Sequence, residues 1–362
     1  MRSPPRNWGS NLPATVVAAY DAPVPPTPLA EVPMRLLISL LACGLAGAAA
    51  AADPVTRGTV PVSVAGDEAA RVPPEYRLKA EDFAFEARVK YDLRYSGVEV
   101  IAVTFPTALP SAFAVNNTVH CEYFRPKGLA KPGPAVIVLD ILDGAGVVSR
   151  GQAMWLAVHG VPAICMTMPY YGPRRPDDKT AGKQRFLSMD VASSLDHVRQ
   201  CVLDARRAVA WLATQPDVDP AKLGLVGTSL GSFMGGIVAA SEPRITSASL
   251  LLGGGGLVDA FAEHPQGAAV FAALRVVGLS KATLQGVVAR VDPITYAEQL
   301  KAKRLLLIAA SRDDIVPPVA MRQLWRATGE PKILWYDATH VGSAQFVFPM
   351  MNAVLAHIRD EK

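Results

Sequence analysis

The chain has 362 residues, of which 50% are hydrophobic and 19% are charged. This composition supplies enough apolar side chains for a large core, and it excludes a disordered or collagen-like protein. The 36 lysines and arginines barely outnumber the 32 aspartates and glutamates, so the charge does not favour nucleic-acid binding. Four cysteines without a C-x-x-C pair favour neither a disulfide scaffold nor a zinc site. These features are typical of a globular enzyme.

The amino-terminal part of the chain predicts export. Residues 1–33 are rich in proline and show no periodicity, so we interpret them as a disordered leader or as sequence upstream of the true start. Met34 begins a short apolar run that ends in small residues, which is typical of a signal peptide over 34–52 with cleavage before Asp53. An uncleaved anchor and a lipid-modified Cys43 stay open as alternatives. We expect a periplasmic or extracellular protein with no membrane span after cleavage.

Signal cleavage leaves three cysteines, namely Cys121, Cys165 and Cys201. Disulfides persist in an exported protein. Because three is an odd number, at least one thiol is free or pairs between chains. Cys165 lies in the apolar run VPAICMTMP, so we interpret it as a buried hydrophobic residue.

The remaining chain predicts an α/β fold. Residues 53–80 are interpreted as a linker, and Phe83 to Phe124 is rich in β-branched and aromatic residues, which predicts antiparallel strands at one sheet edge. From Pro134 short apolar strands alternate with helical stretches such as 198–213, so residues 81–362 are expected to form a mainly parallel sheet with helices on both faces. The parallel strands are predicted at 135–139, 163–168, 223–226, 247–252, 305–309 and 332–336. In such sheets ligands bind at the carboxyl ends of the strands.

The clearest chemical motif is G-x-S-x-G at residues 227–231, directly after one predicted strand and before a helix. A sharp turn of this kind presents Ser229 as a nucleophile, and glycines on both sides leave room for a strained backbone. The Leu230 N–H at the start of the helix is then available to an oxyanion. A glycine-rich packing turn or a phosphate loop is the alternative, although no G-K-[ST] follows.

A serine nucleophile needs a base and an acid that orients the base. Of six histidines, His340 alone follows a late predicted strand and precedes the last helix. The segment SRDDIVPP places Asp313 and Asp314 after the preceding strand, and its D-x-x-V-P spacing favours Asp313. Both carboxylates and the histidine are also compatible with ordinary solvated loops. The order serine, aspartate, histidine is the one expected of α/β-hydrolases.

From about Pro134 to Lys362 the chain resembles an α/β-hydrolase of the dienelactone hydrolase and acetyl-esterase-like type. The motifs GTSLG, SRDDIVPP and DATHVG carry the resemblance. A dienelactone hydrolase proper has cysteine as its nucleophile, whereas this chain has Ser229, so the resemblance implies esterase chemistry. It also implies a small helical cap, which we place around residues 257–291.

One departure from the relatives concerns the oxyanion hole. Most of them carry His-Gly after the third strand, where this chain has Asp140 and Ile141. The second donor is therefore expected to be the N–H of Ile141 or of Leu142. Asp140 is equally compatible with local hydrogen bonds that shape the loop.

The segment MPYYGPRRP follows the fourth strand of the fold, and it supplies candidate substrate contacts. A hydroxyl of Tyr170 or Tyr171 is suited to assist the oxyanion hole, and Arg174 is suited to bind a substrate carboxylate. Packing tyrosines and a solvated arginine are the alternatives.

These inferences together predict an exported serine hydrolase that cleaves a small carboxylic ester through an acyl-enzyme, without a metal or organic cofactor. Ser229, His340 and Asp313 form the predicted triad. A serine exopeptidase of the same fold and a non-catalytic binding protein on a hydrolase scaffold stay open. The 362 residues show no long propeller, which disfavours an oligopeptidase-like form of the first alternative.

Overall fold

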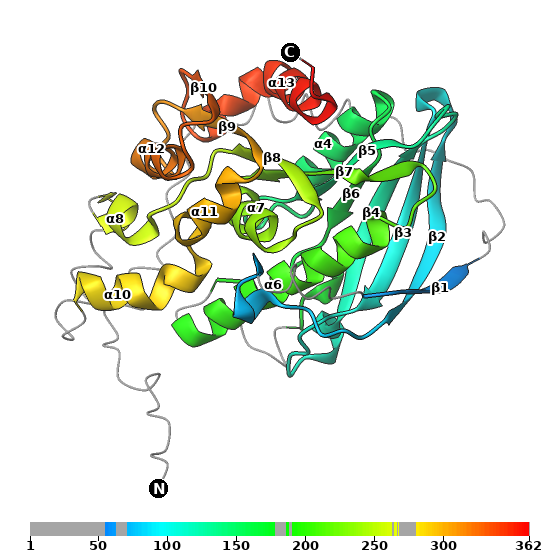
Figure 1. Cartoon of the computed structure of the whole chain (residues 1–362), viewed down its shortest axis with the longest axis horizontal. Coiled ribbons are helices and arrows are strands. Elements are labelled where there is room, and N and C mark those ends of the chain that lie inside the picture. Colours follow the sequence, from blue (N-terminus) through cyan, green and yellow to red (C-terminus); the bar gives the residue numbers. More distant parts are fainter. Residues whose placement is uncertain are drawn as a thin grey trace, which may run out of the picture.

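Within the described residues, ten strands form one sheet in the order β1-β2-β3-β4-β6-β5-β7-β8-β9-β10 (Figure 1). The computed structural model describes residues 55–62, 71–177, 186–187, 190–262, 264–265, 267 and 280–361. The first four strands are antiparallel, and β6 pairs antiparallel with β4. From β6 to β10 all strands are parallel. The strands are β1 (Thr56–Val60), β2 (Phe83–Leu93), β3 (Val98–Pro106), β4 (Thr118–Pro126), β5 (Gly133–Leu139), β6 (Ala163–Met166), β7 (Val218–Thr228), β8 (Ile245–Leu251), β9 (Arg304–Ala310) and β10 (Lys332–Tyr336).

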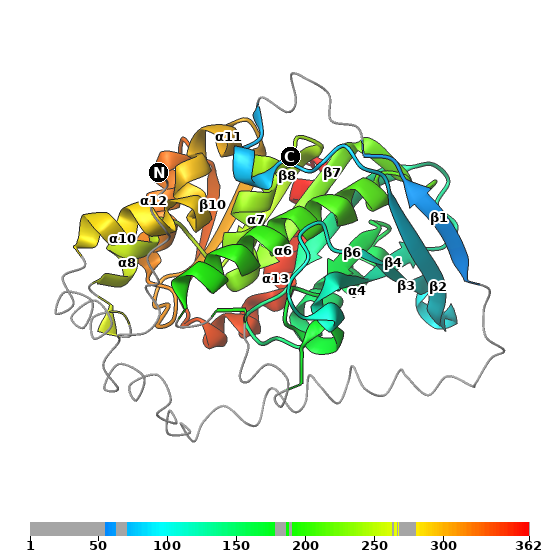
Figure 2. The same ribbon diagram turned by 90° about the horizontal axis from the view of Figure 1, so that it is seen from below.

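Helices cover both faces of the sheet, as the alternation of strands and helices predicts. In β5, Ala135, Ile137 and Leu139 face one apolar core while Val136 and Val138 face the other. The first core is closed by α6 (Val191–Leu212), α7 (Leu230–Ser241), α11 (Ala297–Lys301) and α12 (Pro318–Ala327). The second is closed by α4 (Val147–Val158) and α13 (Val347–Arg359). Figure 2 shows α6 and α7 lying beside each other on one side of the sheet. The predicted α/β-hydrolase architecture is confirmed.

Short elements connect this framework. The cap region contains α8 (Leu257–Ala262) and α10 (Lys281–Val288) among its described residues. The short 3-10 helices are η1 (Pro74–Tyr76), η2 (Arg94–Ser96), η3 (Ala114–Asn117), η4 (Gly172–Arg174), η5 (Ala289–Val291), η6 (Pro293–Tyr296) and η7 (Val341–Phe346). The predicted helix over 198–213 begins earlier, at Val191, because the Asp190 side chain caps it by accepting a hydrogen bond from the Ala192 N–H.

The linker predicted over residues 53–80 is wrong for the part that the structure describes. Residues 56–60 form β1, which pairs with β2 at the sheet edge. Val60, Val72 and Tyr76 are each at most 3% exposed and belong to the core. A short amphipathic edge strand is difficult to distinguish from a linker by periodicity alone, because few of its residues are buried.

The predictions for 1–33, for the signal peptide over 34–52 and for Cys43 lie outside the described residues. In the described part, one helical stretch, Val341–Arg359, is long and apolar enough to cross a membrane. Its Met350, Val354 and Ile358 are buried against the sheet, so the core accounts for its apolar side chains. The cysteines at 121, 165 and 201 are free and buried, and burial raises their pKa values.

Candidate active site

Ser229 lies at the sharp turn between β7 and α7. Its backbone has φ 53° and ψ −117°, an unfavourable conformation for a residue with a side chain. The flanking glycines make this turn possible. A Cβ on Gly227 would lie 2.1 Å from the Gly231 carbonyl oxygen, and a Cβ on Gly231 would lie 2.2 Å from the Leu139 carbonyl oxygen. The turn therefore has the geometry of a nucleophile elbow.

The structure brings Ser229, His340 and Asp313 together in one hydrogen-bonded line. Nε2 of His340 lies 3.1 Å from Oγ of Ser229, and Nδ1 lies 2.7 Å from Oδ2 of Asp313. These distances suit a base that takes the serine proton and an acid that orients the ring. The three residues come from the ends of β7, β9 and β10, which meet at the same edge of the sheet.

The two neighbouring aspartates have different partners. The Asp313 side chain is 3% exposed, and its second oxygen accepts hydrogen bonds from the N–H groups of Ile315 and Val316 at 3.0 and 2.7 Å. Asp314 instead accepts a hydrogen bond from the backbone N–H of His340 at 3.2 Å. Asp313 therefore orients the imidazole, whereas Asp314 holds the loop that carries it.

The predicted oxyanion donors lie on two segments that touch each other. The steric contact of Gly231 with the end of β5 places the first turn of α7 against the loop that contains Ile141 and Leu142. Among the described residues, the N–H groups of Leu230, Ile141 and Leu142 have no hydrogen-bond acceptor. All three stay candidates for the oxyanion hole.

Asp140 shapes this loop. Its carboxylate accepts hydrogen bonds from the N–H groups of Gly146 at 2.6 Å and Ser149 at 3.2 Å, so it caps the start of α4. The structure therefore favours the local role that the sequence left open for this residue.

The two predicted tyrosines have different surroundings. The Tyr171 hydroxyl accepts a hydrogen bond from the Asp143 N–H at 3.2 Å, which places it against the oxyanion loop. Burial raises the pKa of Tyr171 above its ordinary value, so the hydroxyl keeps its proton. The Tyr170 ring packs against His197 and Phe113, with centroid separations of 4.0 and 6.2 Å. A role in substrate binding stays a prediction for both.

The substrate-binding role predicted for Arg174 is wrong, because this residue is 0% exposed. Its guanidinium pairs with Asp204 at 2.7 Å and donates to the carbonyl oxygens of Asn116 and Thr167. A motif that places an arginine after a strand does not specify whether the side chain turns outward or inward, and here it turns inward to a carboxylate on α6.

Replacing Arg174 with alanine is expected to lower the free energy of unfolding by about 3–5 kcal/mol, since it leaves the Asp204 carboxylate buried without its charge partner. Urea denaturation measures this loss. We expect kcat/KM of the folded fraction to change little. Unchanged stability together with a large rise in KM would restore the substrate-binding role.

A further contact next to the nucleophile was not predictable from the sequence. The Gln152 side chain on α4 donates a hydrogen bond to the hydroxyl of Thr228 at 2.9 Å, directly before Ser229. No sequence motif relates two residues so far apart in the chain. Within the described ranges, no group of three or more His, Cys, Asp or Glu side chains is placed to hold a metal ion.

The chain combines an α/β-hydrolase fold with a hydrogen-bonded Ser-His-Asp triad, in which the serine lies at the turn after β7. Residues 191–333, which include Ser229 and Asp313, match the sequence model of the prolyl oligopeptidase family.

Several proteins are similar to this chain. An uncharacterized protein of Mycobacterium tuberculosis is 24% identical over 190 residues, which are 51% of this chain and 43% of that relative. A second one from the same species is 27% identical over 224 residues, which are 58% of this chain and 63% of that relative. The chain thus spans less than two thirds of the length of these curated relatives.

Solved structures share the fold at low sequence identity. An acetyl xylan esterase from a Paenibacillus species has a TM-score of 0.61 and 19% identity, and the match covers 75% of this chain and 88% of the other. Acetyl xylan esterase 1 from a Thermoanaerobacterium species has a TM-score of 0.55 and 17% identity, covering 75% and 87%. A cold-adapted esterase from an Arctic intertidal metagenomic library has a TM-score of 0.50 and 16% identity, covering 73% and 94%.

Proposed function

We propose that this protein hydrolyses small carboxylic esters through a covalent acyl-enzyme. The observation that carries the proposal is the hydrogen-bonded line from Ser229 through His340 to Asp313. The names of the three solved structures above are consistent with it, because all three are esterases.

The proposed reaction has two steps. Oγ of Ser229 attacks the ester carbonyl while Nε2 of His340 takes its proton, and the same nitrogen then protonates the departing alcohol as the acyl-enzyme forms. Water, deprotonated by His340, attacks the acyl-enzyme, and Ser229 recovers its proton as the acid leaves. The Leu230 N–H, with that of Ile141 or Leu142, stabilises the negative oxygen in both steps.

A serine peptidase is the second candidate, and the match of residues 191–333 to the prolyl oligopeptidase family favours it. The two activities use the same triad and differ in the leaving group. We expect turnover of p-nitrophenyl acetate without cleavage of aminoacyl p-nitroanilides. Cleavage of the anilides at a comparable kcat/KM would favour the peptidase.

A binding protein on a hydrolase scaffold is the third candidate, because the loop after β5 lacks the usual His-Gly. A fluorophosphonate probe distinguishes this case, since it labels only an activated serine. We expect labelling at Ser229. A protein that stays unlabelled and turns over neither substrate would favour the binding role.

We also propose that the protein is exported. The proposal rests on the apolar segment over 34–52 and the small residues that end it. Mass spectrometry of the protein purified from its own host is expected to find Asp53 at the amino terminus.

A further inference from the structure

The two ends of the cap meet at one buried carboxylate. Asp292 follows the last turn of the cap and is 5% exposed. Its Oδ1 accepts hydrogen bonds from the N–H groups of Gly256 at 2.9 Å and Ile294 at 3.1 Å, and its Oδ2 accepts one from Leu257 at 2.6 Å. Leu257 begins α8 and Ile294 lies in η6, so a single side chain joins the start of the cap to the chain that leaves it. We call the segments 253–257 and 290–294 the neck of the cap.

The first half of the neck begins with four consecutive glycines, 253–256, which pass through a space without room for side chains. A Cβ on Gly253 would lie 2.3 Å from Oγ of Ser232, in the first turn of α7. A Cβ on Gly254 would lie 2.4 Å from the Ala320 carbonyl carbon, and one on Gly256 would lie 1.9 Å from Oε1 of Gln323, both in α12. The glycine strip is therefore packed between the nucleophile helix and α12. Because glycine restricts the backbone least, the strip depends on its contacts for a fixed path.

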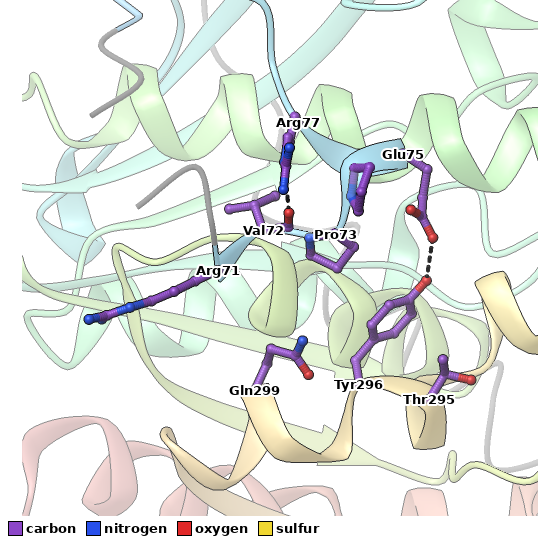
Figure 3. Close-up of a pocket in the computed structure, with 9 residues that line it drawn as sticks. Arg71, Val72, Pro73, Glu75, Arg77, Thr295, Tyr296 and Gln299 are labelled. Atoms are coloured by element: carbon purple, nitrogen blue, oxygen red, sulfur yellow. Dashed lines mark hydrogen bonds between the residues drawn. The ribbon is translucent and has the colours of Figure 1, made fainter. Parts of the chain in front are cut away.

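The second half of the neck is held from the opposite side. The Tyr76 hydroxyl donates to the Arg290 carbonyl oxygen at 2.5 Å, and the Tyr296 hydroxyl lies 2.8 Å from the same oxygen. The Tyr296 hydroxyl also lies 2.9 Å from the carboxylate of Glu75, and both residues line a surface cavity of about 360 Å³ (Figure 3). The cavity lining contains none of the triad residues. These hydroxyls hold the segment 290–294 in place. The Asp292 carboxylate then connects this segment to the end of the glycine strip through its hydrogen bonds with Gly256 and Leu257.

We infer that Asp292 is a positioning residue: its carboxylate fixes the neck of the cap, and this contact determines how tightly esters with larger acyl groups bind at the catalytic edge. The inference rests on the proposed ester hydrolysis. The strip leads from the carboxyl end of β8, whose Leu251 carbonyl accepts a hydrogen bond from the Ser229 N–H, directly into α8. Its four glycines are buried, so displacing the strip moves the start of α8 relative to the nucleophile turn. A small acyl group needs only the triad, whereas a larger one extends toward α8.

The test variant is Asp292→Asn. An asparagine of the same shape keeps one acceptor oxygen for Gly256 and Ile294 but turns an N–H₂ group toward the N–H of Leu257. Burial raises the pKa of Asp292, so the charge itself is unfavourable there, and a neutral amide is expected to fold. The matched control is Asp259→Asn, since Asp259 is a carboxylate of the same cap that binds Lys281 at its exposed outer side.

Three readouts are compared in both variants and the unmodified protein. In Asp292→Asn we expect hydrogen exchange at Leu257 to be about tenfold faster, because its N–H loses its acceptor. KM for p-nitrophenyl octanoate is expected to rise roughly fivefold or more, with KM for the acetate and the rate of fluorophosphonate labelling within about twofold. The Asp259→Asn control is expected to leave all three unchanged.

An unchanged KM for p-nitrophenyl octanoate in Asp292→Asn would overturn the inference. A fall in the fluorophosphonate labelling rate as large as the rise in this KM would also overturn it, because it would indicate general damage to the site. If Asp292→Ala fails to fold, the asparagine variant still decides. If the unmodified protein hydrolyses no ester, the proposed function fails, while unchanged exchange at Leu257 in Asp292→Asn would separately refute the neck contact.

Discussion

Replacing Ser229 with alanine is expected to lower kcat for p-nitrophenyl acetate by on the order of 10⁴–10⁶, because the reaction then has no nucleophile. The fold should be retained, since the backbone at 229 is fixed by its own hydrogen bonds: its N–H donates to Leu251 at 2.8 Å and its carbonyl accepts from Ser232 at 2.9 Å. The residual rate reflects transition-state binding by the oxyanion donors. Stopped assays with purified protein, together with thermal denaturation, measure both quantities.

The matched control is Ser232→Ala, one turn further along the same helix. The Ser232 hydroxyl is buried and has no hydrogen-bond partner among the described residues, so its removal is expected to change kcat by no more than severalfold. Full turnover in Ser229→Ala would refute the assignment of the nucleophile. Equal losses in both variants would indicate that damage to α7, and not loss of the nucleophile, explains the effect.

Much of the sheet was predictable because its parallel strands are buried on both faces. Such strands are short continuous apolar runs, and the strand predicted over 305–309 differs by one residue at each end from β9, in which Leu305 to Ala310 are buried. The prediction fails at the sheet edge. In β1 three of five residues are exposed, so the segment has no apolar run to mark it. Strand β7 also extends before 223 to Val218, through polar residues that no apolar pattern marks.

The triad was predictable because each of its residues lies on a loop that follows a parallel strand. Ser229, Asp313 and His340 directly follow strands, and the carboxyl ends of parallel strands meet at one edge. Side-chain direction is what the sequence did not specify. Arg174 is the last residue of η4, in the segment after β6, but its side chain is buried and pairs with Asp204 of α6. Asp292 has no motif at all, since its three donors come from chain segments that only the folded neck brings together.

The adjacent aspartates allow the acid of the triad to be tested within one loop. Replacing Asp313 with asparagine is expected to lower kcat by about 10⁴, because the amide cannot stabilise the imidazolium and favours the wrong tautomer of His340. Replacing Asp314 with asparagine keeps an oxygen that accepts from the His340 N–H, so a loss of no more than about tenfold is expected. Measuring kcat and the fluorophosphonate labelling rate in both variants checks the contrast.

Each variant serves as the control for the other, because both remove one carboxylate from the same turn. The decisive difference lies in the atom of His340 that each one contacts: Asp313 binds the ring at Nδ1, and Asp314 binds the backbone N–H. Loss of the contact with the ring impairs proton transfer by the imidazole. Loss of the contact with the backbone N–H shifts the loop but leaves the imidazole able to accept and donate protons. If Asp314→Asn is the more damaged variant, the acid has been misassigned and His340 must rotate to reach the other carboxylate during turnover.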